Sequence, residues 1–114
     1  MDKRAHIAIL LDFYGSLLTT KQQEALRLFY DEDLSLAEIA ELLLISRQAV
    51  HDLIKRSEVL LEKYEGQLAL AQKYQERKEQ EERLQLLAKR LQKAPDEQSW
   101  QQFWQVWQAL KDGD

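Results

Sequence analysis

The chain has 114 residues, 45% of them hydrophobic and 32% charged, with a formal net charge of −4. It contains no cysteine, which excludes disulfides and thiolate metal sites, and it has only three glycines and one proline, which is typical of an all-α fold. No apolar run approaches the length of a membrane span and no secretory leader is evident, so we expect a soluble cytoplasmic protein.

Two helices are expected in the first 30 residues. The first covers residues 2–14, with Gly15 as its stop, and its apolar side chains fall at helical spacing: Ile7, Leu10, Leu11 and Tyr14. The second is expected to start at Thr20, because Thr20 and Gln23 have the spacing of a capping box. The acidic residues 31–33 then form a break, which we interpret as a solvated loop; the alternative is an acidic patch that faces a partner.

Residues 34–56 have the spacing of a helix-turn-helix, a motif that presents its second helix to the major groove of DNA. Ser35 and Glu38 predict a capping box that starts the first helix, and Ser46 is placed to cap the second. Each helix has an apolar inner face: Leu36, Ile39, Ala40 and Leu43 on the first, and Ala49, Val50, Leu53 and Ile54 on the second.

The outer face of the second helix predicts a nucleic-acid-binding surface. Gln48, His51 and Lys55 point away from the apolar face, and Arg47 lies at its edge. Residues 46–56 hold three positive side chains and one aspartate, which is enough for weak, salt-sensitive contact with phosphates. A dimer would double these contacts. The alternative interpretation is that these are ordinary exposed helix side chains.

The second helix of the motif is expected to continue to Tyr74, because Gly66 is the only helix-breaking residue before Pro95. Gly66 would mark a bend. A helix over residues 46–74 would be about 40 Å long, too long to bury its apolar stripe on so small a domain. We therefore predict a homodimer.

The chain is expected to divide into a helix-turn-helix domain running into the long helix, residues 1–74, and a helical extension, residues 75–114. The last helix of the extension carries four aromatic residues on one face: Trp100, Phe103, Trp104 and Trp107. Such a concentration of aromatic side chains predicts either docking on the dimer or a surface that binds a protein partner.

No catalytic constellation is found in the sequence. His6 and His51 are the only histidines, and neither has enough neighbouring ligands for a metal site. The glycines are scattered singly, so no phosphate-binding loop is present, and no serine lies in a nucleophile-elbow motif. We expect no enzymatic activity, no metal and no cofactor.

Four short motifs combine between Leu18 and Leu68: the Thr-x-Lys-Gln of residues 19–22, the aromatic pair Phe29-Tyr30, Asp33-Leu-Ser-Leu, and Ile45-Ser-Arg-Gln-Ala-Val. Together they resemble the YlxM family of small bacterial proteins and, more distantly, the fourth conserved region of sigma factors, which reads the upstream promoter element. The resemblance covers about two thirds of the chain and fades after Tyr74.

The resemblance implies a helix-turn-helix regulator of the sigma-region-four type. It also implies a link to co-translational protein targeting, because the family's genes lie beside those for the signal recognition particle GTPase Ffh and its receptor FtsY. By similarity to sigma region four, the groove-facing residues would be Arg47, Gln48, His51 and Lys55, with Arg56 near a phosphate.

Leu44 departs from the Gly or Asn that is usual at the turn of such motifs, where the backbone is left-handed. A leucine in that conformation costs roughly 1 kcal/mol or more. Either the turn is reshaped, or packing of the Leu44 side chain offsets the strain.

Two functions follow as alternatives. In the first, a dimer binds duplex DNA and regulates transcription. In the second, the same fold is a protein- or RNA-binding adaptor of the signal recognition particle, with Ffh, FtsY or the particle RNA as its partner. The intact pattern of residues 46–56 favours DNA, whereas the acidic balance, Leu44 and the tryptophans favour the adaptor.

Overall fold

The computed structural model describes residues 2–112, and over this range the chain is all-α, with no strands. The helices are α1 (Lys3–Tyr14), a 3-10 turn η1 (Gly15–Leu17), α2 (Thr20–Tyr30), α3 (Leu36–Leu43), α4 (Arg47–Leu68), α5 (Leu70–Lys93) and α6 (Glu97–Asp112). The chain divides into two compact units, one ending at Ala71 and the other beginning at Gln72.

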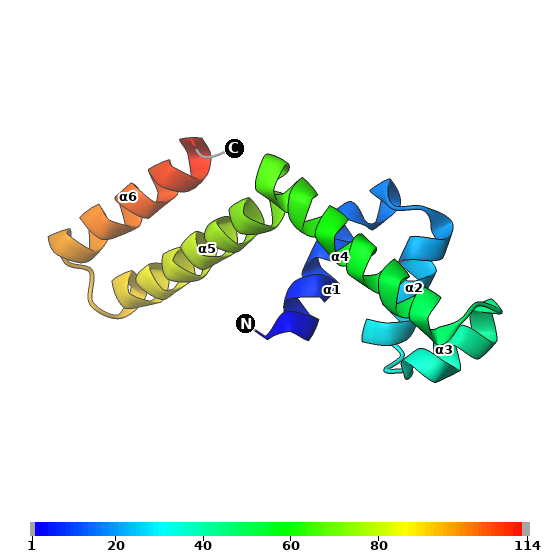
Figure 1. Cartoon of the computed structure of the whole chain (residues 1–114). Coiled ribbons are helices and arrows are strands. Elements are labelled where there is room, and N and C mark those ends of the chain that lie inside the picture. The colour runs from blue at the N-terminus through cyan, green and yellow to red at the C-terminus, as the bar shows by residue number, and fades with distance from the viewer. Residues whose placement is uncertain (1, 113–114) are drawn as a thin grey trace. The chain divides into compact units, whose positions relative to one another are not determined.

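The first unit is built around α4, which contacts α1, α2 and α3 (Figure 1). Four fully or almost fully buried residues follow the helical period along α4: Val50, Ile54, Ser57 and Leu61. Ser57 is tolerated there because its hydroxyl donates to the Leu53 carbonyl at 2.7 Å. The expected apolar face of α1 is buried as well: Ile7, Leu10, Leu11 and Tyr14.

The helix-turn-helix lies in α3 and α4. The capping box of Ser35 and Glu38 is confirmed, and so is the Ser46 cap, whose hydroxyl accepts from the Ala49 N–H at 3.0 Å. Leu44 has φ 57° and ψ 42°, so the turn keeps the left-handed residue expected at this position. The Leu44 side chain is 90% exposed, however, so its packing does not offset the strain.

The N-terminal cap of α2 differs from the prediction by one residue. The residue that caps α2 is Thr19, paired with Gln22, and not Thr20 paired with Gln23. The two adjacent threonines made both registers plausible, and Thr19 forms the complete capping box, with hydrogen bonds in both directions between Thr19 and Gln22. Gly15 follows the last residue of α1, as predicted; it has right-handed backbone angles and starts η1.

The prediction of one helix from Ser46 to Tyr74 is wrong. α4 ends at Leu68, and Ala69 takes a left-handed conformation with φ 52° before α5 begins. Two hydrogen bonds close this junction: the Leu70 N–H donates to the Tyr14 hydroxyl at 3.0 Å, and the Ala71 N–H donates to the Glu65 carboxylate at 3.0 Å. Gly66, which was expected to mark a bend, lies inside α4.

Most of the apolar stripe of α4 is covered within the chain itself. Leu61 is fully buried, and Leu60 and Tyr64 pack against the core of the first unit. Leu68 remains 46% exposed. The argument for a homodimer from a long, uncovered helix therefore fails, and a homodimer needs a different basis.

The second unit is a hairpin in which α5 and α6 run antiparallel (Figure 1). Asp96 begins α6: its carboxylate accepts from the Ser99 N–H at 2.7 Å and from the Ser99 hydroxyl at 3.0 Å, and these bonds lower the pKa of Asp96. Leu87 and Val106 are buried. Within residues 2–112, no helix is long and apolar enough to cross a membrane.

Candidate nucleic-acid interface

The outer face of α4 carries all five residues that the sequence predicted for nucleic-acid binding. Every one of them is exposed: Arg47, Gln48, His51, Lys55 and Arg56. Their exposure follows from the burial of the opposite face of α4, because Val50 and Ile54 are turned into the core. The capped start of α4 at Ser46 also leaves the N-terminal end of a helix dipole beside this face.

Asp52 lies among these residues and contacts two of them. Its Oδ1 accepts a hydrogen bond from the Gln48 side-chain amide at 3.0 Å and lies 3.5 Å from Nδ1 of His51. Because all three side chains are exposed, these contacts are weak and can be exchanged for contacts with a ligand. The carboxylate lowers the positive charge of the face.

Lys55 and Arg56 have different surroundings. Lys55 pairs with Glu58, with 3.8 Å between the ammonium nitrogen and Oε2. Arg56 and Lys55 both line a shallow groove with Gln22 and Val59, and Val59 is 67% exposed. Lys55 and Arg56 therefore bring two cations to one groove on α4.

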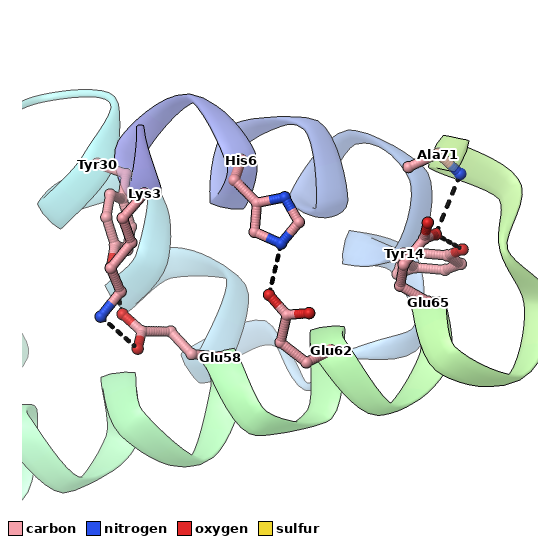
Figure 2. Close-up of polar contacts among 8 residues, drawn as sticks. All are labelled: Lys3, His6, Tyr14, Tyr30, Glu58, Glu62, Glu65 and Ala71. Carbon is pink, nitrogen blue, oxygen red and sulfur yellow. Dashed lines mark hydrogen bonds and ion pairs between the residues drawn. The ribbon is translucent and has the colours of Figure 1, made fainter. Parts of the chain in front are cut away.

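Glu58 is a buried carboxylate that the sequence analysis did not single out. The Tyr30 hydroxyl donates to its Oε1, and its Oε2 lies 3.3 Å from the ammonium of Lys3 (Figure 2). Burial of Tyr30 and its hydrogen bond to Glu58 raise the pKa of the Tyr30 hydroxyl. The charge of Glu58 is compensated by lysines from two helices, Lys3 of α1 and Lys55 of α4.

Glu58 belongs to a row of three carboxylates along α4. Figure 2 shows Glu58, Glu62 and Glu65 facing Lys3, His6 and Tyr14 of α1. The His6 Nε2 lies 2.6 Å from Glu62, and the Tyr14 hydroxyl donates to Glu65 at 2.5 Å. The three glutamates are spaced at i, i+4 and i+7, so they lie on one face of α4. This spacing is visible in the sequence, and it marks a polar face of α4 that contacts α1.

The aromatic residues of α6 do not all lie on one exposed face. Phe103 is partly buried and stacks on Trp100, with ring centroids 5.6 Å apart. Trp100, Trp104 and Trp107 are 45% to 56% exposed, and we call these three side chains the tryptophan surface. Trp100 and Trp104 line a shallow groove with Gln101 and Gln105.

The arrangement suits binding more than bond-making or bond-breaking chemistry. Between residues 2 and 112, no group of three or more His, Cys, Asp or Glu side chains is positioned to hold a metal ion. The exposed cations of α4 can contact phosphates, and its amide and imidazole side chains can hydrogen bond to base edges.

The fold and the exposed second helix define a protein of the helix-turn-helix class, a fold that suggests nucleic-acid binding. Residues 1–102 match the model of the UPF0122 family, described as "Putative helix-turn-helix protein, YlxM / p13 like", and the chain belongs to this family. The description implies a binding role more than a catalytic one.

Several relatives share half or more of the matched residues. The UPF0122 protein YlxM of Bacillus subtilis is 51% identical over 88 residues, which are 77% of this chain and 80% of that protein. A UPF0122 protein of Bacillus velezensis is 51% identical over 92 residues, 81% of this chain and 84% of the relative. One from Clostridium acetobutylicum is 54% identical over 74 residues, 65% of this chain and 64% of the relative.

The family match extends further than the sequence resemblance suggested. It passes Tyr74, includes all of α5, and ends within α6 at residue 102. Trp100 is inside the matched range, whereas Trp104 and Trp107 lie beyond it.

Proposed function

We propose that this protein is a non-catalytic regulator that binds duplex DNA through the outer face of α4. In this proposal Gln48 and His51 read base edges in the major groove, and Arg47, Lys55 and Arg56 contact the flanking phosphates. The observation that carries it is the exposure of all five side chains on a capped helix, held by α3 in a helix-turn-helix.

Binding by a single copy would be weak. Residues 46–56 contribute three cations, partly opposed by Asp52, and the whole chain is acidic. Each phosphate contact releases counterions, so the affinity should fall steeply as the salt concentration rises. We propose that two copies of the chain bind together, because a second helix-turn-helix doubles the phosphate contacts.

The test is fluorescence anisotropy of a labelled duplex of about 20 base pairs, long enough for two half-sites one helical turn apart, titrated at several salt concentrations. Lys55→Glu should reduce the affinity at least tenfold, because it removes one phosphate contact and adds repulsion. Lys63→Glu, the same change at an exposed site further along α4, is the control and should reduce it far less. Equal losses for the two variants would contradict the proposal.

A second candidate function is that of an adaptor that binds a protein or RNA of the signal recognition particle. The exposed tryptophan surface favours it, because half-exposed tryptophans are typical of protein-binding hot spots. The partner-binding residues would be Trp100, Phe103, Trp104 and Trp107. The family resemblance supplies the particular partners: Ffh, FtsY or the particle RNA.

A pull-down from bacterial lysate, with and without nuclease, separates the two functions. If the adaptor function holds, wild-type protein retains Ffh, FtsY or the particle RNA, and a Trp104→Ala/Trp107→Ala variant loses it. If the DNA function holds, DNA fragments are recovered only without nuclease, and neither Ffh, FtsY nor the particle RNA is retained.

A further inference from the structure

A groove of about 370 Å³ lies beside the proposed DNA-binding face and is lined by residues from four helices. Its lining includes His51 and Lys55 of α4 and Lys3 and Arg4 of α1. The groove therefore joins two residues of the proposed binding face to the N-terminal turn of a helix that sequence reasoning had assigned only to the core.

Lys3 and Lys55 are held together by a single oxygen atom. Oε2 of Glu58 lies 3.3 Å from the ammonium nitrogen of Lys3 and 3.8 Å from that of Lys55. The Lys3 side chain is 60% exposed and that of Lys55 is 54% exposed, whereas that of Glu58 is 11% exposed. Both ammonium groups therefore have unused donors on the solvent side, since each carries three.

The charges around the groove leave an excess of one positive charge at this lysine pair. Glu58 supplies one negative charge against two ammonium groups, and its other oxygen accepts from the Tyr30 hydroxyl. Arg4 is engaged elsewhere, because it donates to the Tyr30 carbonyl at 2.7 Å and to Asp33 at 2.8 Å. The two lysines thus carry a positive charge that Glu58 does not compensate, whereas the charge of Arg4 is paired with Asp33.

We propose that Lys3 and Lys55 together bind one phosphate of the nucleic-acid backbone, which makes Lys3 a further binding residue contributed by α1. The inference rests on the proposed DNA-binding function and extends its surface from α4 to α1. A phosphate oxygen accepts from two ammonium groups without strict directional demands, because ammonium acts as a compact point charge. Glu58 is the positioning residue, because it keeps the two cations side by side.

The test is the affinity of the Lys3→Met variant for the labelled duplex, measured by fluorescence anisotropy at several salt concentrations. Methionine keeps an unbranched side chain of similar length but removes the charge. The affinity should fall about three- to tenfold near physiological salt, and the slope of log affinity against log salt should become shallower by about 0.9, the value for one phosphate contact. Lys63→Met, on the exposed surface of α4, is the matched control and should leave the slope unchanged.

Lys3→Arg distinguishes phosphate binding from a structural role of Lys3. Arginine keeps the charge and should restore the wild-type slope, whereas equal weakening by Met and Arg would overturn the inference. A wild-type slope for Lys3→Met, with a reduced slope for Lys55→Met, would also overturn it while leaving the DNA-binding function intact. Absence of salt-dependent binding by the wild type would instead reject the proposed function itself.

Discussion

Leu44 adopts a backbone conformation that few leucines adopt, and it gains almost nothing from its side chain. Its φ is 57° and its side chain is 90% exposed. What it provides is the end of α3: the N–H groups of Leu44 and Ile45 both donate to the Ala40 carbonyl, the latter at 3.2 Å. Ile45 then packs against the core. These bonds and the Ile45 contact offset the strain at Leu44.

Replacing Leu44 with glycine should therefore stabilise the protein. Glycine adopts the left-handed conformation without strain, which outweighs the entropy it adds to the unfolded chain, so the free energy of unfolding should rise by about 0.5–1 kcal/mol. Urea denaturation with an unchanged m value is the measurement.

Leu42→Gly is the matched control, because Leu42 is also exposed but lies within α3. There glycine should lower the free energy of unfolding by about 1 kcal/mol. A destabilised Leu44→Gly variant would mean that the Leu44 side chain makes a contribution that its exposure does not reveal.

At the scale of elements, the junction between α4 and α5 depends on a residue far away in the sequence. The Tyr14 hydroxyl of α1 donates to Glu65 near the end of α4 and accepts from the Leu70 N–H at the start of α5. One hydroxyl thus fixes three helices at one point. Burial, followed by the hydrogen bond to Glu65, raises the pKa of Tyr14 above its ordinary value of 10.0.

The raised pKa of Tyr14 predicts a loss of stability in alkali. The neutral hydroxyl is favoured in the folded state, so its contribution is complete below the unfolded-state pKa of about 10 and is lost as the pH rises through the folded-state value. Tyr14→Phe should cost about 1–2 kcal/mol at neutral pH, because it leaves the Leu70 N–H unpaired.

Urea unfolding from neutral pH to about pH 11 measures both effects. The gap between wild type and Tyr14→Phe should narrow as the pH rises. The pKa of Tyr30 is raised as well, so alkali destabilises both proteins through Tyr30. The quantity to compare is therefore the difference between the free energies of unfolding of wild type and Tyr14→Phe. Parallel curves at all pH values would contradict a titrating role for Tyr14.

The same junction explains what the sequence could and could not predict. The capping box at Ser35 and the cap at Ser46 involve residues three apart, so local pattern was sufficient for the helix-turn-helix. The break at Ala69 was missed because alanine favours helix and the groups that close the junction include Tyr14, 56 residues before Leu70.

The candidate site also has one part that the local sequence predicts and another part that depends on residues far apart in the sequence. The exposure of Gln48, His51 and Lys55 follows from the helical period and was predicted. The position of Lys3 beside Lys55 depends on how α1 packs on α4, and that requires Glu58 as the shared partner. A one-residue error at Thr19 arose where two adjacent threonines offer two equivalent caps.

At the scale of the whole molecule, the two units differ in how well they bury apolar surface. The first has a continuous core formed by α1, α2, α3 and α4. In the second, within residues 72–112, the buried apolar side chains are Leu87 and Val106. A two-helix unit of this size gains little stability from such a small core, and units of this kind are usually stabilised by association. This is the basis on which we predict a homodimer.

The tryptophan surface is the expected contact of this homodimer. Sedimentation velocity at micromolar concentrations should show a dimer for the wild type and a shift toward monomer for Trp104→Ala/Trp107→Ala, because each truncation removes a large apolar contact. Gln98→Ala, at an exposed position on the same helix outside the groove of Trp100 and Trp104, should leave the dimer intact. A wild-type monomer, or a dimer that survives the tryptophan changes, would contradict the prediction.

During synthesis, α1 leaves the ribosome well before α4, the helix that completes its burial. Ile7, Leu10 and Leu11 are buried in a unit whose longest helix ends at Leu68, and the partners of Tyr14 follow 51 and 56 residues later. At typical rates of translation this delay is roughly three to ten seconds. For that interval the apolar face of α1 is exposed on the nascent chain, where it is a natural target for a chaperone.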